Sequence, residues 1–106
     1  MIDHLASRPE TTKSYFETCV VLVEFYARWC GTCRALTRTL NAVEPIVGIP
    51  IVRVDIDDDP ALAVRYDVLG VPQLLYLKDG VEMTRASGSL DESEFAVWYS
   101  AARSSR

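Results

Sequence analysis

The most hydrophobic part of the chain is a run from Val20 to Ala27, in which Glu24 is the one charged residue. An almost continuous apolar run of this length is typical of a strand buried on both faces, as at the centre of a parallel sheet. Apolar residues then recur at helical spacing, at Leu36, Leu40, Val43 and Val47. This spacing predicts an amphipathic helix, which Pro45 should kink or end.

The middle of the chain continues with strand and helix patterns. A turn at 48–50 precedes a strand over 51–56, so that strand, helix and strand should form a right-handed parallel crossover. Asp59 and Pro60 are suited to the N-cap and first turn of a short helix that runs to Tyr66.

The C-terminal part predicts a hairpin followed by a helix. Strands over 73–78 and 81–86 flank Asp79-Gly80, which is a strong signal for a hairpin turn. Residues 89–91 should cap a final helix, and its apolar contacts come from Leu90, Phe95, Trp98 and Tyr99. The tail over 103–106 should fray.

The N-terminal part is less strongly patterned. Residues 1–5 are consistent with a short edge strand, and residues 9–18 with a helix that has Ser7 as its N-cap. This helix would place Tyr15 and Phe16 against the core.

Length and composition restrict the class of protein. At 106 residues the chain is long enough for one core and too short for two, so we expect a single domain over residues 1–106. A net charge of −4 disfavours a nucleic-acid-binding surface, which would be basic. No apolar run approaches the roughly 18 residues of a membrane helix, and the first residues have no features of a signal peptide. Three cysteines, an odd number, do not suggest a secreted disulfide framework, so we expect a reducing, cytoplasmic location.

The chemistry of the chain centres on Cys30 and Cys33, which follow the buried run and open the predicted long helix. Two cysteines at this spacing can close a small disulfide or open to a dithiol, and the helix N-terminus favours a thiolate on the first of them. The same spacing also occurs in structural thiol pairs and in half of a zinc site. Zinc is disfavoured because there is no second Cys-x-x-Cys, and only Cys19 and His4 remain as soft ligands.

Five stretches carry a resemblance to a known family, in its order and at nearly its spacing: 23–33, 54–57, 70–72, 78–80 and Gly88. The first contains Trp-Cys-Gly-Thr-Cys and the third is Gly-Val-Pro. In these stretches the chain resembles the thioredoxin family. The resemblance implies the thioredoxin fold, a three-layer α/β/α arrangement in which a central mixed β-sheet is flanked by about four helices.

The resemblance also implies roles for individual residues. Cys30 would be an exposed nucleophile that forms a mixed disulfide with the substrate, and Cys33 would resolve it. Glu24 stands where the family usually carries a buried aspartate that takes the proton of the second cysteine. Burial would raise the pKa of Glu24 and suit it to general-base work, although the strand pattern alone also allows a solvent-facing residue. Arg53 lies near the position of a lysine that often pairs with that acid.

Pro72 matches the cis-proline of the family, which lies against the active-site disulfide. A cis bond before Pro72 would turn the Val71 backbone toward an extended substrate, which could bind as an added strand. By the same resemblance, Trp29, Gly70, Val71 and Gly88 form an apolar rim where substrates dock.

Three residues depart from the family pattern. Thr32, which follows Gly31 inside the motif, replaces a proline and adds an N–H and a hydroxyl that can stabilise a thiolate. We therefore expect a redox potential less reducing than the ~−270 mV of thioredoxin. Arg38 replaces a proline that kinks the active-site helix in many relatives, so a straighter helix is expected. Tyr26 replaces a tryptophan.

Together, these features predict a thiol–disulfide oxidoreductase that reduces protein disulfides. The resemblance implies recharging by a flavin- and NADPH-dependent thioredoxin reductase, and a monomer that holds no cofactor beyond the Cys30–Cys33 redox disulfide. Two alternatives stay open. One is a thioredoxin-like protein with a more specialised or more oxidising disulfide-exchange role, and the other is a module that binds partners without turnover.

Several other residues have a structural interpretation. Cys19 is either a small buried hydrophobic residue or a regulatory or dimer-forming thiol. His4 is expected on the surface of the first strand. A group of four aspartates is better interpreted as a capped helix start than as a calcium loop, because it lacks the required glycine and glutamate: Asp55, Asp57, Asp58 and Asp59. Trp98 and Tyr99 are core or helix-surface aromatic residues.

Overall fold

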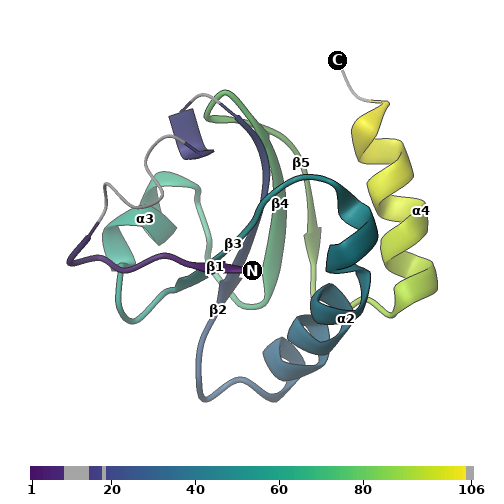
Figure 1. Ribbon diagram of the computed structural model, residues 1–106. Coiled ribbons are helices and arrows are strands. Elements are labelled where there is room, and N and C mark those ends of the chain that lie inside the picture. The colour runs from purple at the N-terminus through teal and green to yellow at the C-terminus, as the bar shows by residue number, and fades with distance from the viewer. Residues whose placement is uncertain (9–14, 18, 105–106) are drawn as a thin grey trace.

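The computed structural model describes residues 1–8, 15–17 and 19–104. Within these residues, five strands form one sheet in the order β1-β3-β2-β4-β5 (Figure 1). The strands are β1 (Ile2–Asp3), β2 (Val20–Tyr26), β3 (Ile51–Asp55), β4 (Gln73–Lys78) and β5 (Val81–Ser87). Strands β1, β3 and β2 run parallel, whereas β4 pairs antiparallel with β2 and with β5. The predicted central mixed sheet is confirmed.

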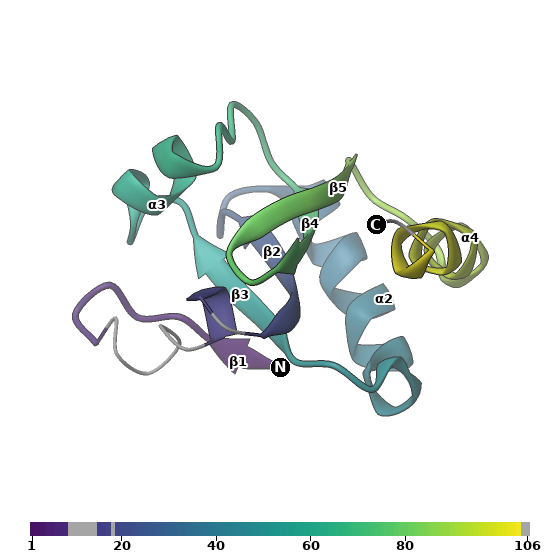
Figure 2. The same ribbon diagram turned by 90° about the horizontal axis from the view of Figure 1, so that it is seen from above.

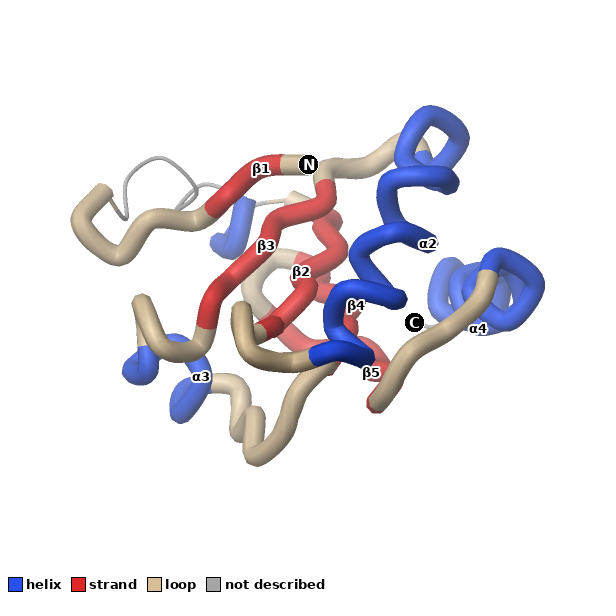
Figure 3. Tube along the Cα trace, turned by 90° about the horizontal axis from the view of Figure 1, so that it is seen from below, coloured by secondary structure: helices blue, strands red, loops and turns tan. Residues whose placement is uncertain are grey.

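Helices cover both faces of this sheet. Helices α2 (Gly31–Val47) and α4 (Glu92–Arg103) lie on one face, and α3 (Pro60–Arg65) lies on the other (Figure 2). The view from the opposite side shows the same layers (Figure 3). Residues 15–17 are helical, and the remainder of the helix predicted over 9–18 lies outside the described residues. Among the helices that the structure describes, none is long and apolar enough to cross a lipid bilayer.

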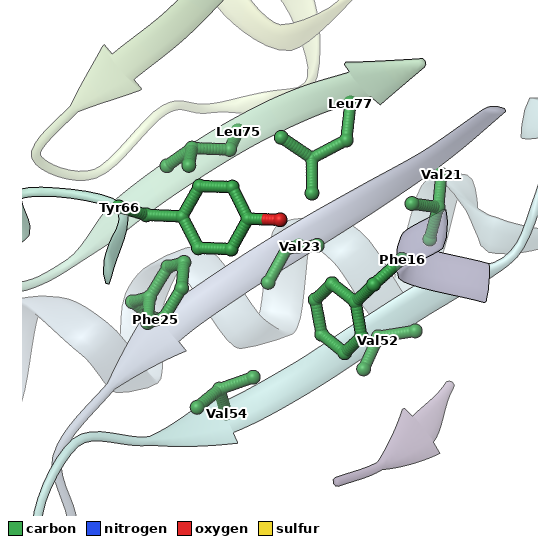
Figure 4. Close-up of a cluster of buried hydrophobic side chains, with 9 residues drawn as sticks. All are labelled: Phe16, Val21, Val23, Phe25, Val52, Val54, Tyr66, Leu75 and Leu77. Carbon is green, nitrogen blue, oxygen red and sulfur yellow. The ribbon is translucent and has the colours of Figure 1, made fainter. Parts of the chain in front are cut away.

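Strand β2 lies at the centre of the sheet, and its segment 21–25 has no solvent exposure. Its side chains alternate between the two faces. One set packs with Phe16 and Tyr66 on the α3 face (Figure 4): Val21, Val23 and Phe25. Leu22 packs on the α2 face, and the alternation places Glu24 on that face as well. The central strand therefore carries its one charged side chain toward α2.

Helix α2 buries the predicted apolar stripe against the sheet: Leu36, Leu40, Val43 and Val47, preceded by Cys33. The helix continues past Pro45 to Val47, so Pro45 does not end it, which was one of its two predicted effects. Proline removes one backbone donor, and its usual acceptor would be the carbonyl of Asn41, an exposed residue where water can serve instead. The helix ends at Gly48, whose φ of 80° is the left-handed conformation that suits glycine at a C-cap.

The remaining elements begin with the predicted signals. The Asp59 side chain accepts a hydrogen bond from the first turn of α3. Asp79 and Gly80 both have positive φ, at 52° and 83°, and form the turn between β4 and β5. Asp91 caps α4 and forms a capping box with Glu94. Local sequence signals therefore set most of the element boundaries on the C-terminal side of the molecule.

Two residues near the N-terminus differ from expectation. His4 was expected on the surface but is only 7% exposed, because its ring packs edge-on against Phe16 and its Nε2 lies 2.8 Å from Asp59 Oδ2. This contact ties the end of β1 to the N-cap of α3. Cys19 is half-buried, which excludes the fully buried small hydrophobic residue, and a regulatory or dimer-forming thiol stays a prediction.

Candidate active site

The two cysteines of the motif lie where β2 passes into α2. Cys30 is the N-cap of α2, with φ −95° and ψ 114°, and its sulfur accepts a hydrogen bond of 3.2 Å from the backbone N–H of Cys33. The hydroxyl of Thr32 lies 3.3 Å from the same sulfur. The Cys30 sulfur thus occupies the position in which an N-cap oxygen usually meets the free N–H groups of a helix, a place that favours negative charge.

The two thiols have opposite acidity. Burial disfavours the Cys30 thiolate, but hydrogen bonds from Cys33 and Thr32 outweigh this effect and lower the pKa of Cys30. Burial, hydrogen bonding to Cys30 and the nearby charge of Glu24 raise the pKa of Cys33 to about 12. Cys30 is therefore the more easily ionised of the two thiols, and Cys33 needs a base before it can react.

Both cysteines are less exposed to solvent than the sequence suggested. Cys30 is 6% exposed and Cys33 is 1% exposed, so the expectation of an exposed Cys30 was wrong. The reason is that half-buried side chains pack over the pair: Tyr26, Ile56 and Val71. Most of the Cys30 side chain is therefore shielded from solvent.

The loop before β4 faces Cys30 across the site. The peptide bond between Val71 and Pro72 is cis, and the Cys30 sulfur lies 3.8 Å from the Val71 carbonyl oxygen. The backbone N–H of Gly88 donates to the Pro72 carbonyl at 3.0 Å. These contacts bring Val71, Pro72 and Gly88 beside the motif, with Gly70 exposed next to Val71.

An exposed aromatic residue borders the site on the other side. Trp29 is 69% exposed, and its indole N–H donates to Asp57 Oδ2 at 3.0 Å. Leu69 is 92% exposed beside Gly70. Sequence reasoning missed the roles of Asp57 and Leu69, since Asp57 was explained as part of a helix start and a single leucine gave no signal.

Glu24 is a buried acid with two partners. It has no solvent exposure, which excludes a solvent-facing strand residue. Arg53 Nε donates to Oε1 at 3.0 Å, and the hydroxyl of Thr37 donates to Oε2 at 2.7 Å. Burial raises the pKa of Glu24, although the bonds from Thr37 and Arg53 oppose this effect. The predicted pairing of Glu24 with Arg53 is confirmed, whereas Thr37 was missed, and its signal was its position one helical turn after Cys33.

A cavity of about 300 Å³ lies beside this network. Its lining includes Cys33, Thr37 and Arg53, together with Tyr26, Ala27, Arg28 and Arg34. The guanidinium of Arg53 stacks on the ring of Tyr26, 4.1 Å from its centroid. Cys33 therefore borders a polar cavity on the side of the molecule where Glu24 is held.

The aspartates at the end of β3 and directly after it have structural roles in the fold. Asp55 Oδ1 accepts from the backbone N–H of Asp57 at 2.9 Å, and Asp59 caps α3. Arg28 lies 3.4 Å from Asp55 and 3.3 Å from Asp58. Across the part of the chain that the structure describes, no group of three or more His, Cys, Asp or Glu side chains is placed to hold a metal ion.

The sheet order, the Cys-x-x-Cys at the N-terminus of α2 and the facing proline loop define the class of thiol–disulfide oxidoreductases. The thioredoxin family model matches residues 9–101. The thioredoxin of Chlamydia caviae is 40% identical over 84 residues, which cover 78% of this chain and 82% of that protein. The chain belongs to the thioredoxin family.

Solved structures agree with this assignment. The X-ray structure of Fasciola hepatica thioredoxin superposes with a TM-score of 0.78 at 27% identity, covering 96% of this chain and 99% of that one. A single-residue mutant of the thioredoxin from Halobacterium salinarum gives a TM-score of 0.80 at 28% identity, covering 97% of this chain and 88% of that one. The predicted thioredoxin fold and thiol–disulfide oxidoreductase function are confirmed.

Proposed function

We propose that this chain reduces disulfides of protein substrates through a cycle of Cys30 and Cys33. The observation that carries the proposal is the position of the two sulfurs, because Cys30 caps α2 and accepts the Cys33 N–H at 3.2 Å whereas Cys33 is buried inside the first turn. These positions lower the pKa of Cys30 and raise the pKa of Cys33 to about 12. Such a pair gives an order of events, because Cys30 can attack first while Cys33 stays a thiol.

The cycle has two displacement steps. The Cys30 thiolate attacks one sulfur of the substrate disulfide, which breaks that bond, forms a mixed disulfide and releases a first substrate thiolate that takes a proton from water. Glu24 takes the proton of Cys33, and the new Cys33 thiolate attacks the Cys30 sulfur. The second substrate thiolate leaves, and the Cys30–Cys33 disulfide remains. The substrate gains two electrons and the dithiol loses two.

The role of proton acceptor for Glu24 is supported by its burial and by its partners. A raised pKa brings a carboxyl closer to the operating pH, where a general base is most effective. Arg53, which has part of its side chain in solvent, holds one carboxyl oxygen at 3.0 Å. Gly31 and Thr32 complete the turn that presents both sulfurs.

The substrate would bind along the loop opposite Cys30. The Val71 backbone borders the Cys30 sulfur and can pair with an extended segment as an added strand. Trp29, Gly70 and Gly88 form the rim, and Leu69 extends it with an exposed apolar side chain. Asp57 fixes the orientation of the Trp29 ring through its bond to the indole.

Family membership supports the remaining assignments. We assign residues 1–106 to a single domain that acts as a monomer in the cytoplasm. The chain needs no cofactor in this scheme, and a flavin- and NADPH-dependent thioredoxin reductase would return the Cys30–Cys33 disulfide to the dithiol.

Reduction of a disulfide-bonded test protein, with dithiothreitol as the electron donor, tests the proposal. Cys30→Ser should abolish the catalysed rate, whereas Cys33→Ser should accumulate a mixed disulfide through Cys30 that mass spectrometry detects. Cys19→Ser is the matched control and should keep the full rate. Activity that survives Cys30→Ser would contradict the proposal, and undiminished partner binding by the Cys30→Ser, Cys33→Ser double variant would favour a binding module.

A more oxidising exchange role is the second candidate, and the Thr32 hydroxyl at 3.3 Å from the Cys30 sulfur favours it. Stabilising the thiolate stabilises the reduced form, which raises the redox potential. Equilibration against glutathione, followed by alkylation, distinguishes the two roles. A midpoint near about −270 mV supports the reductase, and a midpoint near about −180 mV supports the exchange role.

A further inference from the structure

Thr37 is a polar side chain that the cycle described above does not use. It lies one helical turn after Cys33 in α2, so both side chains are on the helix face that meets the sheet. Its hydroxyl lies 2.7 Å from Glu24 Oε2, 3.0 Å from the Cys33 carbonyl oxygen and 3.4 Å from Arg53 Nη2. A threonine inside a helix commonly bonds the carbonyl one turn earlier, and here the same hydroxyl also meets a buried carboxyl.

The two oxygens of Glu24 are held from different elements. Arg53 on β3 holds Oε1, and Thr37 on α2 holds Oε2. A glutamate side chain loses more rotamer freedom than a shorter acid when it is fixed, so each of these contacts restrains motion that would take the carboxyl away from Cys33. Cys33 and Thr37 line the same cavity.

The Thr37 hydroxyl fits both protonation states of Glu24. A hydroxyl has one proton to donate and two lone pairs to accept with. When Glu24 is ionised, Thr37 donates to Oε2. When Glu24 is protonated, the carboxyl can donate to Thr37, whose own proton then turns to the Cys33 carbonyl at 3.0 Å. Arg53 donates in both states and has no lone pair to accept a proton.

We propose that Thr37 is a positioning residue for the proton transfer from Cys33, because it holds the Glu24 carboxyl in place before and after the proton arrives. The inference rests on the proposed role of Glu24 as the acceptor. In the step concerned, the proton leaves Cys33 Sγ for Glu24, the Cys33–Cys30 bond forms, and the bond from Cys30 to the substrate sulfur breaks. Thr37 exchanges hydrogen-bond partners and forms no covalent bond.

Rapid mixing of the reduced protein with a disulfide labelled on both halves tests this inference. The first label leaves when Cys30 attacks, and the second leaves when Cys33 resolves the mixed disulfide. Thr37→Val should slow the second phase about tenfold at pH 7, since it removes a hydrogen bond to a charged group. The loss should shrink as the pH rises, because the ionised form of Glu24 is then restored. The first phase should keep its wild-type rate.

Two variants serve as controls. Thr37→Ser keeps the hydroxyl and should restore the wild-type pH profile. Thr39→Val removes a hydroxyl from the same helix that donates to the Leu90 carbonyl at 2.7 Å, away from Glu24, and should leave both phases unchanged. Circular dichroism and unfolding curves establish that each variant is folded at the assay temperature.

The outcomes distinguish failure of the role inferred for Thr37 from failure of the role proposed for Glu24. A second phase in Thr37→Val with the wild-type rate and pH profile overturns the inference. So does an equal slowing at every pH that Thr37→Ser shares, because that result describes a structural role. If Glu24→Gln slows the second phase and Thr37→Val does not, only the role of Thr37 fails. If Glu24→Gln itself leaves the second phase unchanged, the proposed role of Glu24 fails with it.

Discussion

The two faces of β2 differ in the side chains that they bury and in what these side chains do. On the α3 face, Val21, Val23 and Phe25 pack into a cluster formed by apolar and aromatic side chains (Figure 4). On the α2 face, Leu22 has the same kind of packing, but Glu24 two residues later is equally buried and carries a polar network. One strand of a single sheet therefore contributes mainly stability on one side and chemistry on the other.

The difference shows how a small domain can hold a buried acid. Burying an ionisable group is costly unless it is hydrogen-bonded or neutral. Packing on the apolar face contributes stability that offsets the cost of burying Glu24. Arg53 and Thr37 lower this cost, because each donates a hydrogen bond to one carboxyl oxygen. The remaining penalty appears as a raised pKa, which is the property that a proton acceptor for Cys33 requires.

The largest expected effect concerns the two thiols next to the α2 face. In reduced Cys19→Ser protein, iodoacetamide at pH 7 should label Cys30 more than about a thousandfold faster than Cys33, because the thiolate is the nucleophile and the pKa of Cys33 is about 12. The pH midpoint of the Cys30 labelling rate should lie below that of an ordinary cysteine thiol, because hydrogen bonds lower the pKa of Cys30. Mass spectrometry of timed samples measures both rates. Similar labelling rates for the two cysteines would contradict the proposal that Cys30 attacks before Cys33.

The second effect tests the apolar face. Phe25→Ala should lower the free energy of unfolding by about 3–5 kcal/mol, because it leaves a cavity in a cluster that has no polar function. Urea unfolding measures the change, and Val97→Ala on the exposed side of α4 is the control, with an expected change within about 0.5 kcal/mol. A loss as small as that of the control would show that this face is not the main source of stability.

The third effect is the pH dependence of stability from the polar face. Because burial raises the pKa of Glu24, the folded state binds this proton more tightly than the unfolded state. The resulting stability is fully present below the unfolded pKa and is lost as the pH rises through the folded pKa. Glu24→Gln cannot ionise, so its stability relative to the wild type should rise by up to about 1.4 kcal/mol per pH unit in that window. Urea unfolding at several pH values checks this, and a difference that stays constant or falls with pH contradicts it.

The smallest effect comes from the cap of the helix that covers the apolar face. Asp59→Ala should destabilise the protein by about 1 kcal/mol, since it removes the N-cap of α3. It also removes one partner of His4. The rate of disulfide reduction per folded molecule should stay unchanged, because Asp59 belongs to the stabilising face. Paired unfolding and activity assays measure both quantities, and a lower rate in fully folded variant would break the division between the faces.

Features with a local signal could be predicted from the sequence. The helical stripe of α2, the cap at Asp59 and the turn at Asp79-Gly80 each depend on residues close together in the chain. The burial of Glu24 was favoured but not required by the sequence, because both faces of a central strand are usually covered while the strand pattern alone also allowed a solvent-facing residue.

Several contacts between distant residues could not be predicted. His4 meets Asp59 across 55 positions, and Trp29 meets Asp57 across 28. The cover over Cys30 and Cys33 by Tyr26 and Ile56 also had no signal in the sequence. The continuation of α2 past Pro45 had a different reason, since the penalty of proline depends on whether the acceptor that it leaves free can reach water.

Carbon-13 NMR titration of the glutamate carboxyls in the reduced protein tests whether Glu24 is suited to accept the proton of Cys33. Glu24 should titrate above the usual glutamate value of about 4.3. A midpoint for Glu24 at or below that usual value would mean that the α2 face of β2 holds an ordinary ion pair. In that case, the proton of Cys33 would need another acceptor.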